Sequence, residues 1–214
     1  MFEIIKNINP LMILVFVTFF VGLFFLDLKK NNHKLLFYVL LVCFITEVLS
    51  IYNLIIKNNI NFLYSISLLF YFVLWLLILK STTKFHKTSI LFIFLFILFG
   101  IINLFYFEGI KSFNFSTFIV GAFFYNLIVI VSSIYFIKNE LLNFYKSNEF
   151  LLIIAPILFM FGLSFMFGFK SIDLTNTFVF KKLKLYTFVT YSVNLVNYTL
   201  INIYIYRERK LKNA

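Results

Sequence analysis

Glu47 is an acidic residue inside an otherwise apolar stretch, CFITEVLSIYN at residues 43–53. A carboxyl group in such surroundings can bind a cation, carry a proton or act as a general acid or base. Thr46, Ser50 and Asn53 recur beside it at intervals of four and three residues, which places polar groups along one face of a helix. The stretch therefore predicts a helix with a polar face that could hold a ligand, a proton or a cation.

Polar side chains recur at helical spacing in three further apolar stretches. Tyr64, Ser67 and Tyr71 share one stripe, and Asn126 and Ser133 are two helical turns apart. A third stripe, in the last stretch, repeats at intervals of four, three and four residues and consists of Thr187, Tyr191, Asn194 and Tyr198. The candidate ligand-binding residues are Glu47, Ser50, Tyr71, Asn126, Tyr191, Asn194, Asn197 and Tyr198.

The composition indicates what surrounds these residues. The chain has 214 residues, of which 63% are hydrophobic, 22% aromatic and only 13% charged. A soluble domain with this composition would lack the polar surface that water requires, whereas a membrane protein can turn apolar residues toward lipid. The formal net charge of +11 does not indicate nucleic-acid binding, because the basic residues lie in short gaps between apolar runs, where they set membrane topology.

Seven apolar runs are long enough to cross a bilayer core of roughly 30 Å, which takes about 20 helical residues. Helices are expected because backbone polar groups in lipid must be hydrogen-bonded within their own segment. The predicted fold class is an all-α membrane protein, a single bundle of about seven transmembrane helices over residues 1–214. The predicted spans are about 8–26, 35–56, 60–79, 89–107, 115–137, 150–169 and 185–206.

The distribution of Lys and Arg predicts the orientation of the bundle. One side of the membrane would carry 12 of these residues and the other side 7. Since cytoplasmic loops carry the excess of basic residues, we expect the N-terminus outside and the C-terminus inside. The first run is expected to be kept as a span, because no small-residue cleavage site follows it.

The polar residues of different spans are predicted to lie at similar depths in the membrane. At 1.5 Å per residue, Glu47 falls about 2 Å from the centre of its span, and Asn126 falls at the centre of its own. We expect the helices at 35–56, 60–79, 115–137 and 185–206 to face one another around a polar cluster or small cavity, with 89–107 at the periphery. No Lys, Arg or His falls within a predicted span to pair with Glu47, so its carboxyl group is expected to be protonated. A network that merely joins the helices is the equal alternative.

The sequence lacks the residues that several known activities of membrane proteins require. The span 185–206 has no lysine for a retinal Schiff base, and the single cysteine, Cys43, permits neither a disulfide nor a cysteine metal site. His33 and His86 fall in predicted cytoplasmic loops, where we expect solvated side chains and no zinc site. Ser164 has no histidine within a span to activate it. The sequence therefore predicts no metal or other cofactor, and nothing in it supports an enzyme.

The span 150–169 contains a proline, Pro156, which is expected to kink it. Ser164 and Gly168 form a pair of small residues four positions apart, which permits close contact with a neighbouring helix. Close packing is the simpler interpretation, and a hinge is the alternative.

The segments ITEVLSIYN and NNINFLYSISLLFYFVLW, the late helix with Pro156 and the Asn- and Tyr-rich last helix together resemble small seven-helix integral membrane proteins of Bacteroidota. The resemblance implies a multi-pass protein of a Gram-negative inner membrane and a sensor-like role. It supplies no activity to carry over. Since no signalling domain follows the last span, signalling would need a separate partner.

Three functional interpretations remain open from the sequence. The first is a ligand-sensing or membrane-signalling module, which the polar cluster and the proline favour. The second is a small solute or ion transporter, for which seven helices suit a repeat architecture. The third is a structural or accessory subunit that binds another membrane protein, since 89–107 is apolar almost all round. All three interpretations expect the protein to be surrounded by the lipid bilayer.

Overall fold

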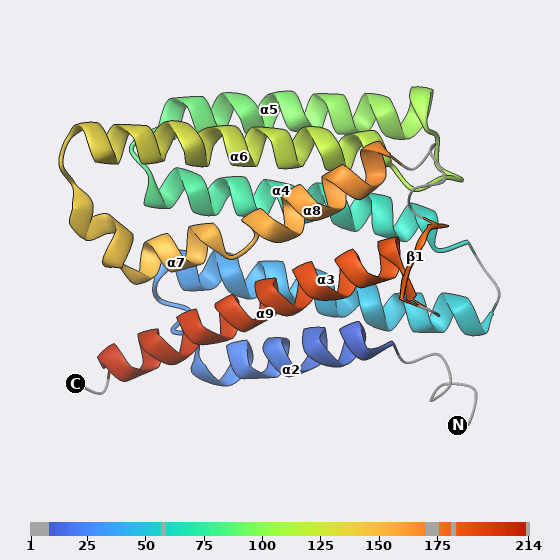
Figure 1. The fold of residues 1–214 in the computed structure, drawn as a ribbon, viewed down its shortest axis with the longest axis horizontal. Helices are drawn as coiled ribbons and strands as arrows, with labels where there is room; N and C mark the ends of the chain where they lie inside the picture. The colour runs from blue at the N-terminus through green and yellow to red at the C-terminus, as the bar shows by residue number, and fades with distance from the viewer. Residues whose placement is uncertain (1–8, 57–58, 170–175, 181–182, 213–214) are drawn as a thin grey trace.

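The computed structural model describes residues 9–56, 59–169, 176–180 and 183–212. Almost all of this chain is helical, as Figure 1 shows. The helices are α2 (Pro10–Phe25), α3 (Asn31–Ile55), α4 (Asn61–Thr82), α5 (His86–Ile102), η1 (Asn103–Phe107), α6 (Phe115–Lys138), η2 (Leu142–Lys146), α7 (Asn148–Ile154), α8 (Ile157–Gly168) and α9 (Leu185–Lys212). Two short antiparallel strands, β1 (Phe178–Phe180) and β2 (Leu183–Lys184), precede α9.

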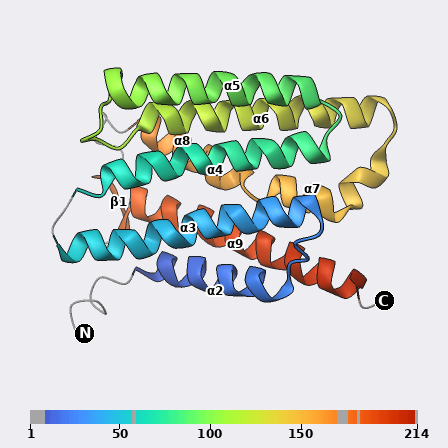
Figure 2. The ribbon, with the colours of Figure 1, turned by 180° about the vertical axis from the view of Figure 1, so that it is seen from behind.

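Successive long helices run in alternating directions along one bundle axis (Figures 1 and 2). The first residues of α4, α6 and α9 lie at the same end as the two strands, and we call this the hairpin end. The opposite end holds the last turns of α9 and the first residues of α3 and α7, and we call it the C-terminal end. Short loops between most consecutive helices suit this up-and-down order.

A helix is present at each of the seven predicted spans, and the all-α prediction is confirmed for the described residues. Five helical segments are long and apolar enough to cross a membrane: Asn31–Ile55, Asn61–Thr82, His86–Phe107, Phe115–Lys138 and Asn148–Gly168. The first helix, Pro10–Phe25, is apolar but has only 16 residues. The last, α9, is long but carries many polar residues, as its sequence indicated. Lys6, Lys57, Lys170, Lys181 and Lys182, from the side predicted to face outward, lie outside the described residues.

The core lies around α4, which contacts α3, α5, α6 and α7. Its Phe72, Trp75 and Leu76 side chains are fully buried. By contrast, α5 exposes a broad apolar face that includes Phe94 and Ile90. The prediction that 89–107 lies at the periphery is confirmed by this exposure, which suits contact with lipid tails or with another apolar surface.

The predicted kink is present as a break between α7 and α8 at Ala155 and Pro156. Proline has no backbone N–H and cannot continue the hydrogen-bond ladder, so carbonyl groups in the preceding turn lose their helical partners. The Tyr125 hydroxyl of α6 donates to one of them, the Ile153 carbonyl, at 2.8 Å. The close contact beyond the break involves Gly162, where an added Cβ would lie 2.7 Å from a Val193 methyl group. The predicted contact at Gly168 is not made, because nothing lies within 4 Å of its Cβ position.

Tyr125→Phe is expected to lower the free energy of unfolding by about 1 kcal/mol, because the Ile153 carbonyl would lose its donor in a buried position. The measurement is reversible unfolding of the purified protein in mixed micelles. Tyr106→Phe is the matched control, since Tyr106 is 82% exposed. Equal stability of both variants and the wild type would show that the bond does not support the broken helix.

Candidate functional site

A cavity of about 290 Å³ lies inside the bundle, between its middle and the hairpin end. Tyr71 and Tyr198 lie at its deep end, near the middle of α4 and α9. Tyr186 lies at the start of α9, close to the hairpin end. The remaining lining residues come from six helices and the loop before α6: Leu11, Val15, Val42, Cys43, Thr46, Glu47, Tyr64, Ser67, Leu68, Phe113, Phe118, Phe159, Leu163, Phe167 and Asn194. The volume is at the lower edge of the range of roughly 300–1,000 Å³ for ligand pockets, which favours a small ligand.

Glu47 reaches this cavity from the middle of α3. The hydroxyl group of Ser50, one turn later, donates to the Glu47 carbonyl at 2.8 Å and lies 3.5 Å from Oε2 of the carboxyl group. Beside it, Thr46 Oγ1 lies 2.7 Å from Ser67 Oγ of α4. Both ion pairs found among the described residues involve Glu208 and neither involves Glu47. The Glu47 carboxyl group therefore has two hydroxyl neighbours, Ser50 on its own helix and Tyr64 of α4, and it lines the cavity together with Tyr64.

Four of the eight predicted residues meet at this cavity: Glu47, Tyr71, Asn194 and Tyr198. Ser50 lies directly behind Glu47 and is fully buried. The prediction that α3, α4 and α9 face one another there agrees with this arrangement.

The prediction for Asn126 of α6 differs from the structure, because Asn126 lines a separate groove with Phe161 and Ser164 of α8. One residue of an α-helix turns by about 100°, and the preceding Tyr125 takes the inward position. A large aromatic ring buries more apolar area than an amide, so it takes the core side of α6. The contribution of α6 to the cavity is Phe118, one turn from the hairpin end.

Two predicted residues of α9 lie elsewhere. Tyr191 donates from its hydroxyl group to Asn9 Oδ1 at 3.0 Å, beside the first residues of α2. Asn197 is 2% exposed and does not line the cavity, and its Oδ1 atom has no hydrogen-bond partner among the described residues. The stripe at intervals of four, three and four residues is therefore shared between the cavity and the contact with α2.

The apolar walls of the cavity were not predicted. Phe159, Leu163 and Phe167 of α8 line it at intervals of four residues, and Leu11 and Val15 of α2 do the same. Repeats at four residues mark one face of a helix, but in an apolar span such a face cannot be told from one that contacts lipid. Only the fold shows which of these faces point inward.

Aromatic rings form one continuous wall of the cavity. Phe159 packs edge-to-face against Tyr71, with ring centroids 5.8 Å apart, and against Phe118 at 5.9 Å. Phe118 packs in the same manner against Phe167 at 5.0 Å. Edge-to-face pairs of this kind fix the ring orientations, so the wall presents a defined aromatic surface.

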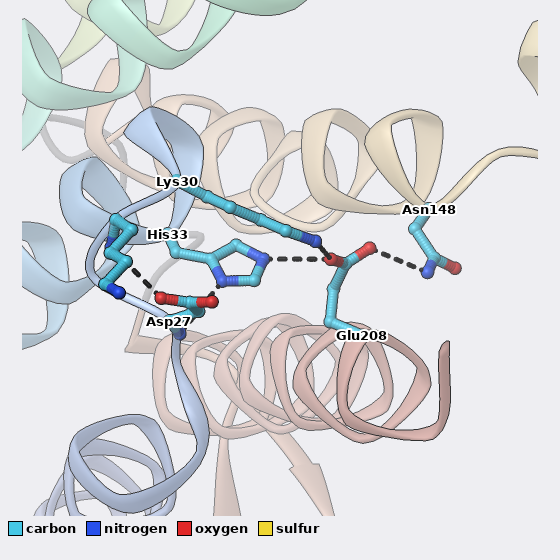
Figure 3. A network of polar contacts seen from close by, with 6 residues as sticks. Asp27, Lys30, His33, Asn148 and Glu208 are labelled. Carbon is cyan, nitrogen blue, oxygen red and sulfur yellow. Dashed lines mark hydrogen bonds and ion pairs between the residues drawn. The ribbon is translucent and has the colours of Figure 1, made fainter. Parts of the chain in front are cut away.

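A second polar cluster lies at the C-terminal end, as Figure 3 shows. The Glu208 carboxylate of α9 accepts from Lys30 Nζ at 2.9 Å and lies 3.0 Å from His33 Nε2, both through Oε2. Its Oε1 atom accepts from Asn148 Nδ2 at 2.9 Å. The first residues of α3 and α7 are thus joined to the last turns of α9, and we call this group the Glu208 network.

The expectation of a solvated His33 is wrong: α3 begins at Asn31, and His33 is 3% exposed. Its Nδ1 atom accepts from the Asp27 backbone N–H at 3.1 Å, so the ring proton sits on Nε2 and is donated to Glu208. Burial alone would raise the pKa of the Glu208 carboxyl group. The hydrogen bonds from Asn148 and Lys30, and the nearby charges, outweigh burial and hold that pKa below 4.5.

No group of three His, Cys, Asp or Glu side chains that could hold a metal ion occurs in the described part of the chain. The described residues form a cavity with aromatic walls and one carboxyl group, and a charged network at the far end of the same helices. Comparisons with models of protein families, with curated proteins and with solved structures gave no match. The resemblance to seven-helix proteins of Bacteroidota therefore stays a prediction.

Proposed function

We propose that this chain is a multi-pass protein of a bacterial inner membrane that senses a small ligand. In this proposal all seven helical segments span the bilayer, with the N-terminus outside and the C-terminus in the cytoplasm. The observation that carries the proposal is the cavity of about 290 Å³, which is lined by Glu47 and Tyr71 and extends toward the hairpin end. The orientation predicted from the basic residues turns the hairpin end outward, so the ligand would enter from outside.

The helices that line the cavity also carry the Glu208 network. Glu47 belongs to α3, and Lys30 and His33 lie at the start of the same helix. Tyr198 and Glu208 are both on α9. The third partner of Glu208, Asn148, begins α7, which continues across the break into the cavity-lining α8. A ligand that shifts any of these helices would alter the network at the cytoplasmic end, where a signalling partner could bind.

The proposal predicts that a small molecule stabilises the reconstituted protein through the cavity. The full chain in lipid nanodiscs would be screened by thermal unfolding against small organic compounds. The unfolding temperature should rise with at least one compound, and Phe159→Leu should reduce that rise because Phe159 forms the cavity wall. Phe161→Leu is the matched control, since Phe161 lies two residues later on α8 and is 63% exposed outside the cavity. A rise lost equally in both variants, or no rise with any compound, would contradict the proposal.

Transport is the second candidate, because a broken helix lies beside the cavity. Discontinuous helices at a midplane site are a feature of secondary transporters, and α7 and α8 form such a helix. Uptake of the stabilising compound into proteoliposomes separates the two functions. Time-dependent uptake that Phe159→Leu reduces would favour transport, and binding without uptake would favour sensing.

A further inference from the structure

The chemistry of the cavity wall points to the class of ligand. Eight of the eighteen lining residues are Phe or Tyr. The face of an aromatic ring carries partial negative charge and attracts cations, most strongly where water is excluded. The wall of Tyr71, Phe159, Phe118 and Phe167 joins these rings by edge-to-face contacts.

Among the described residues that line the cavity, Glu47 alone has an acidic or basic side chain that can carry charge near neutral pH. The other polar groups of the lining are hydroxyl, thiol and amide groups. A carboxylate surrounded by aromatic rings is the arrangement that recognises ammonium groups, because it supplies the opposite charge. It would repel an anion.

Tyr71 supplies a second, independent observation. Its side chain is 9% exposed and lines the cavity, and neither its hydroxyl oxygen nor the Trp75 indole N–H beside it makes a hydrogen bond of standard geometry among the described residues. A buried hydroxyl group without a partner is costly in an apolar interior, so a bound group at this position would stabilise it. An ammonium group can donate hydrogen bonds to both a carboxylate and a hydroxyl oxygen.

We propose that the cavity binds a small hydrophobic amine in its ammonium form, with the charged group at the Glu47 carboxylate and the apolar part against Phe159 and Phe118. This inference rests on the proposed ligand-binding function and deepens it. The small volume and the mainly apolar lining restrict the apolar part to about one ring or a short alkyl chain. The ammonium group also explains how Glu47 could carry its charge near the middle of a span, since ligand and carboxylate would neutralise one another.

Three probes of nearly the same shape test the charge preference: 2-phenylethylamine, the neutral 2-phenylethanol and the anion phenylacetate. Their affinities for the full chain in nanodiscs of uncharged lipid would be measured by titration calorimetry near neutral pH. We expect the amine to bind about tenfold or more tightly than the alcohol, and phenylacetate not to bind. Equal affinities for amine and alcohol would overturn the inference and leave the ligand-binding function in place.

Two pairs of variants test which residues cause the preference for the amine over the alcohol. Glu47→Gln should remove most of the amine preference while the alcohol binds as before, and Glu149→Gln, which changes an exposed glutamate of α7, should leave both affinities unchanged. Phe159→Leu should weaken both probes, whereas Phe161→Leu should weaken neither. An amine preference that survives Glu47→Gln would refute the assignment to Glu47. If no probe binds to the wild type, the amine proposal fails, and the compound screen then decides separately whether the cavity binds any ligand.

Discussion

Gly121→Leu is expected to lower the free energy of unfolding by about 3 kcal/mol, because α6 passes α4 and α5 without room for a side chain. An added Cβ at Gly121 would lie 2.7 Å from Phe72 Cγ and 2.8 Å from Phe96 Cε2. Phe72 and Phe96 are both fully buried, and Phe72 also packs edge-to-face against Phe118 of the cavity wall. Neither ring can move aside without disturbing the core, so the added side chain would push α6 away from α4 and α5.

The matched variant is Gly168→Leu, at the last residue of α8, where nothing lies within 4 Å of the added Cβ. It should leave stability nearly unchanged, since an exposed helix end gains slightly from losing a glycine. Gly121→Ala, which should cost less than the leucine, covers the case in which Gly121→Leu does not fold. All three would be compared by reversible unfolding in mixed micelles. Similar stabilities at positions 121 and 168 would show that α6 can move away from α4.

The positions of the helices follow from the sequence because each span is a long apolar run between polar gaps. Their ends were less predictable. The structure starts α3 at Asn31 and continues α9 to Lys212, since helical hydrogen bonding does not stop where the apolar residues stop. Lysine and arginine are good helix formers and extend a helix beyond its apolar part.

The inward faces were predictable only where a charged or strongly polar group marked them. Glu47 and Tyr198 lie in the cavity as expected, because such groups avoid lipid. Asn126 does not, since Tyr125 beside it fills the core position and bonds the Ile153 carbonyl. In a span made mostly of phenylalanine, isoleucine and leucine, nothing local distinguishes the ring that packs inward from the ring that contacts lipid.

The Glu208 network could not be predicted because its partners are far apart in sequence. Glu208 and His33 are separated by 175 residues, and Glu208 and Lys30 by 178. Glu208 is an acidic residue within the basic segment RERKLK, which is a weak sign that it has a partner elsewhere. Its contacts depend on the order in which the helices pack, and that order is a property of the whole bundle.

Glu208→Ala is expected to lower the free energy of unfolding by about 2–3 kcal/mol, because three donors lose one shared acceptor. His33 and Asn148 contribute most of this figure, since the His33 side chain is 4% exposed and would keep a buried N–H without a partner. Lys30 contributes less, because its side chain is 57% exposed and water can replace the carboxylate. Glu149→Ala is the matched control, as it removes an exposed carboxylate from α7 at the same end.

The pH dependence of stability distinguishes this network from simple loss of packing. The folded pKa of Glu208 lies below 4.5, so the unfolded chain takes up a proton more readily than the folded one. The stabilisation by Glu208 is therefore complete above pH 4.5 and is lost as the pH falls through the lower folded pKa. The stability difference between the wild type and Glu208→Ala should shrink as the pH falls below this range. A difference that does not change with pH would mean that Glu208 acts through packing and not through its charge.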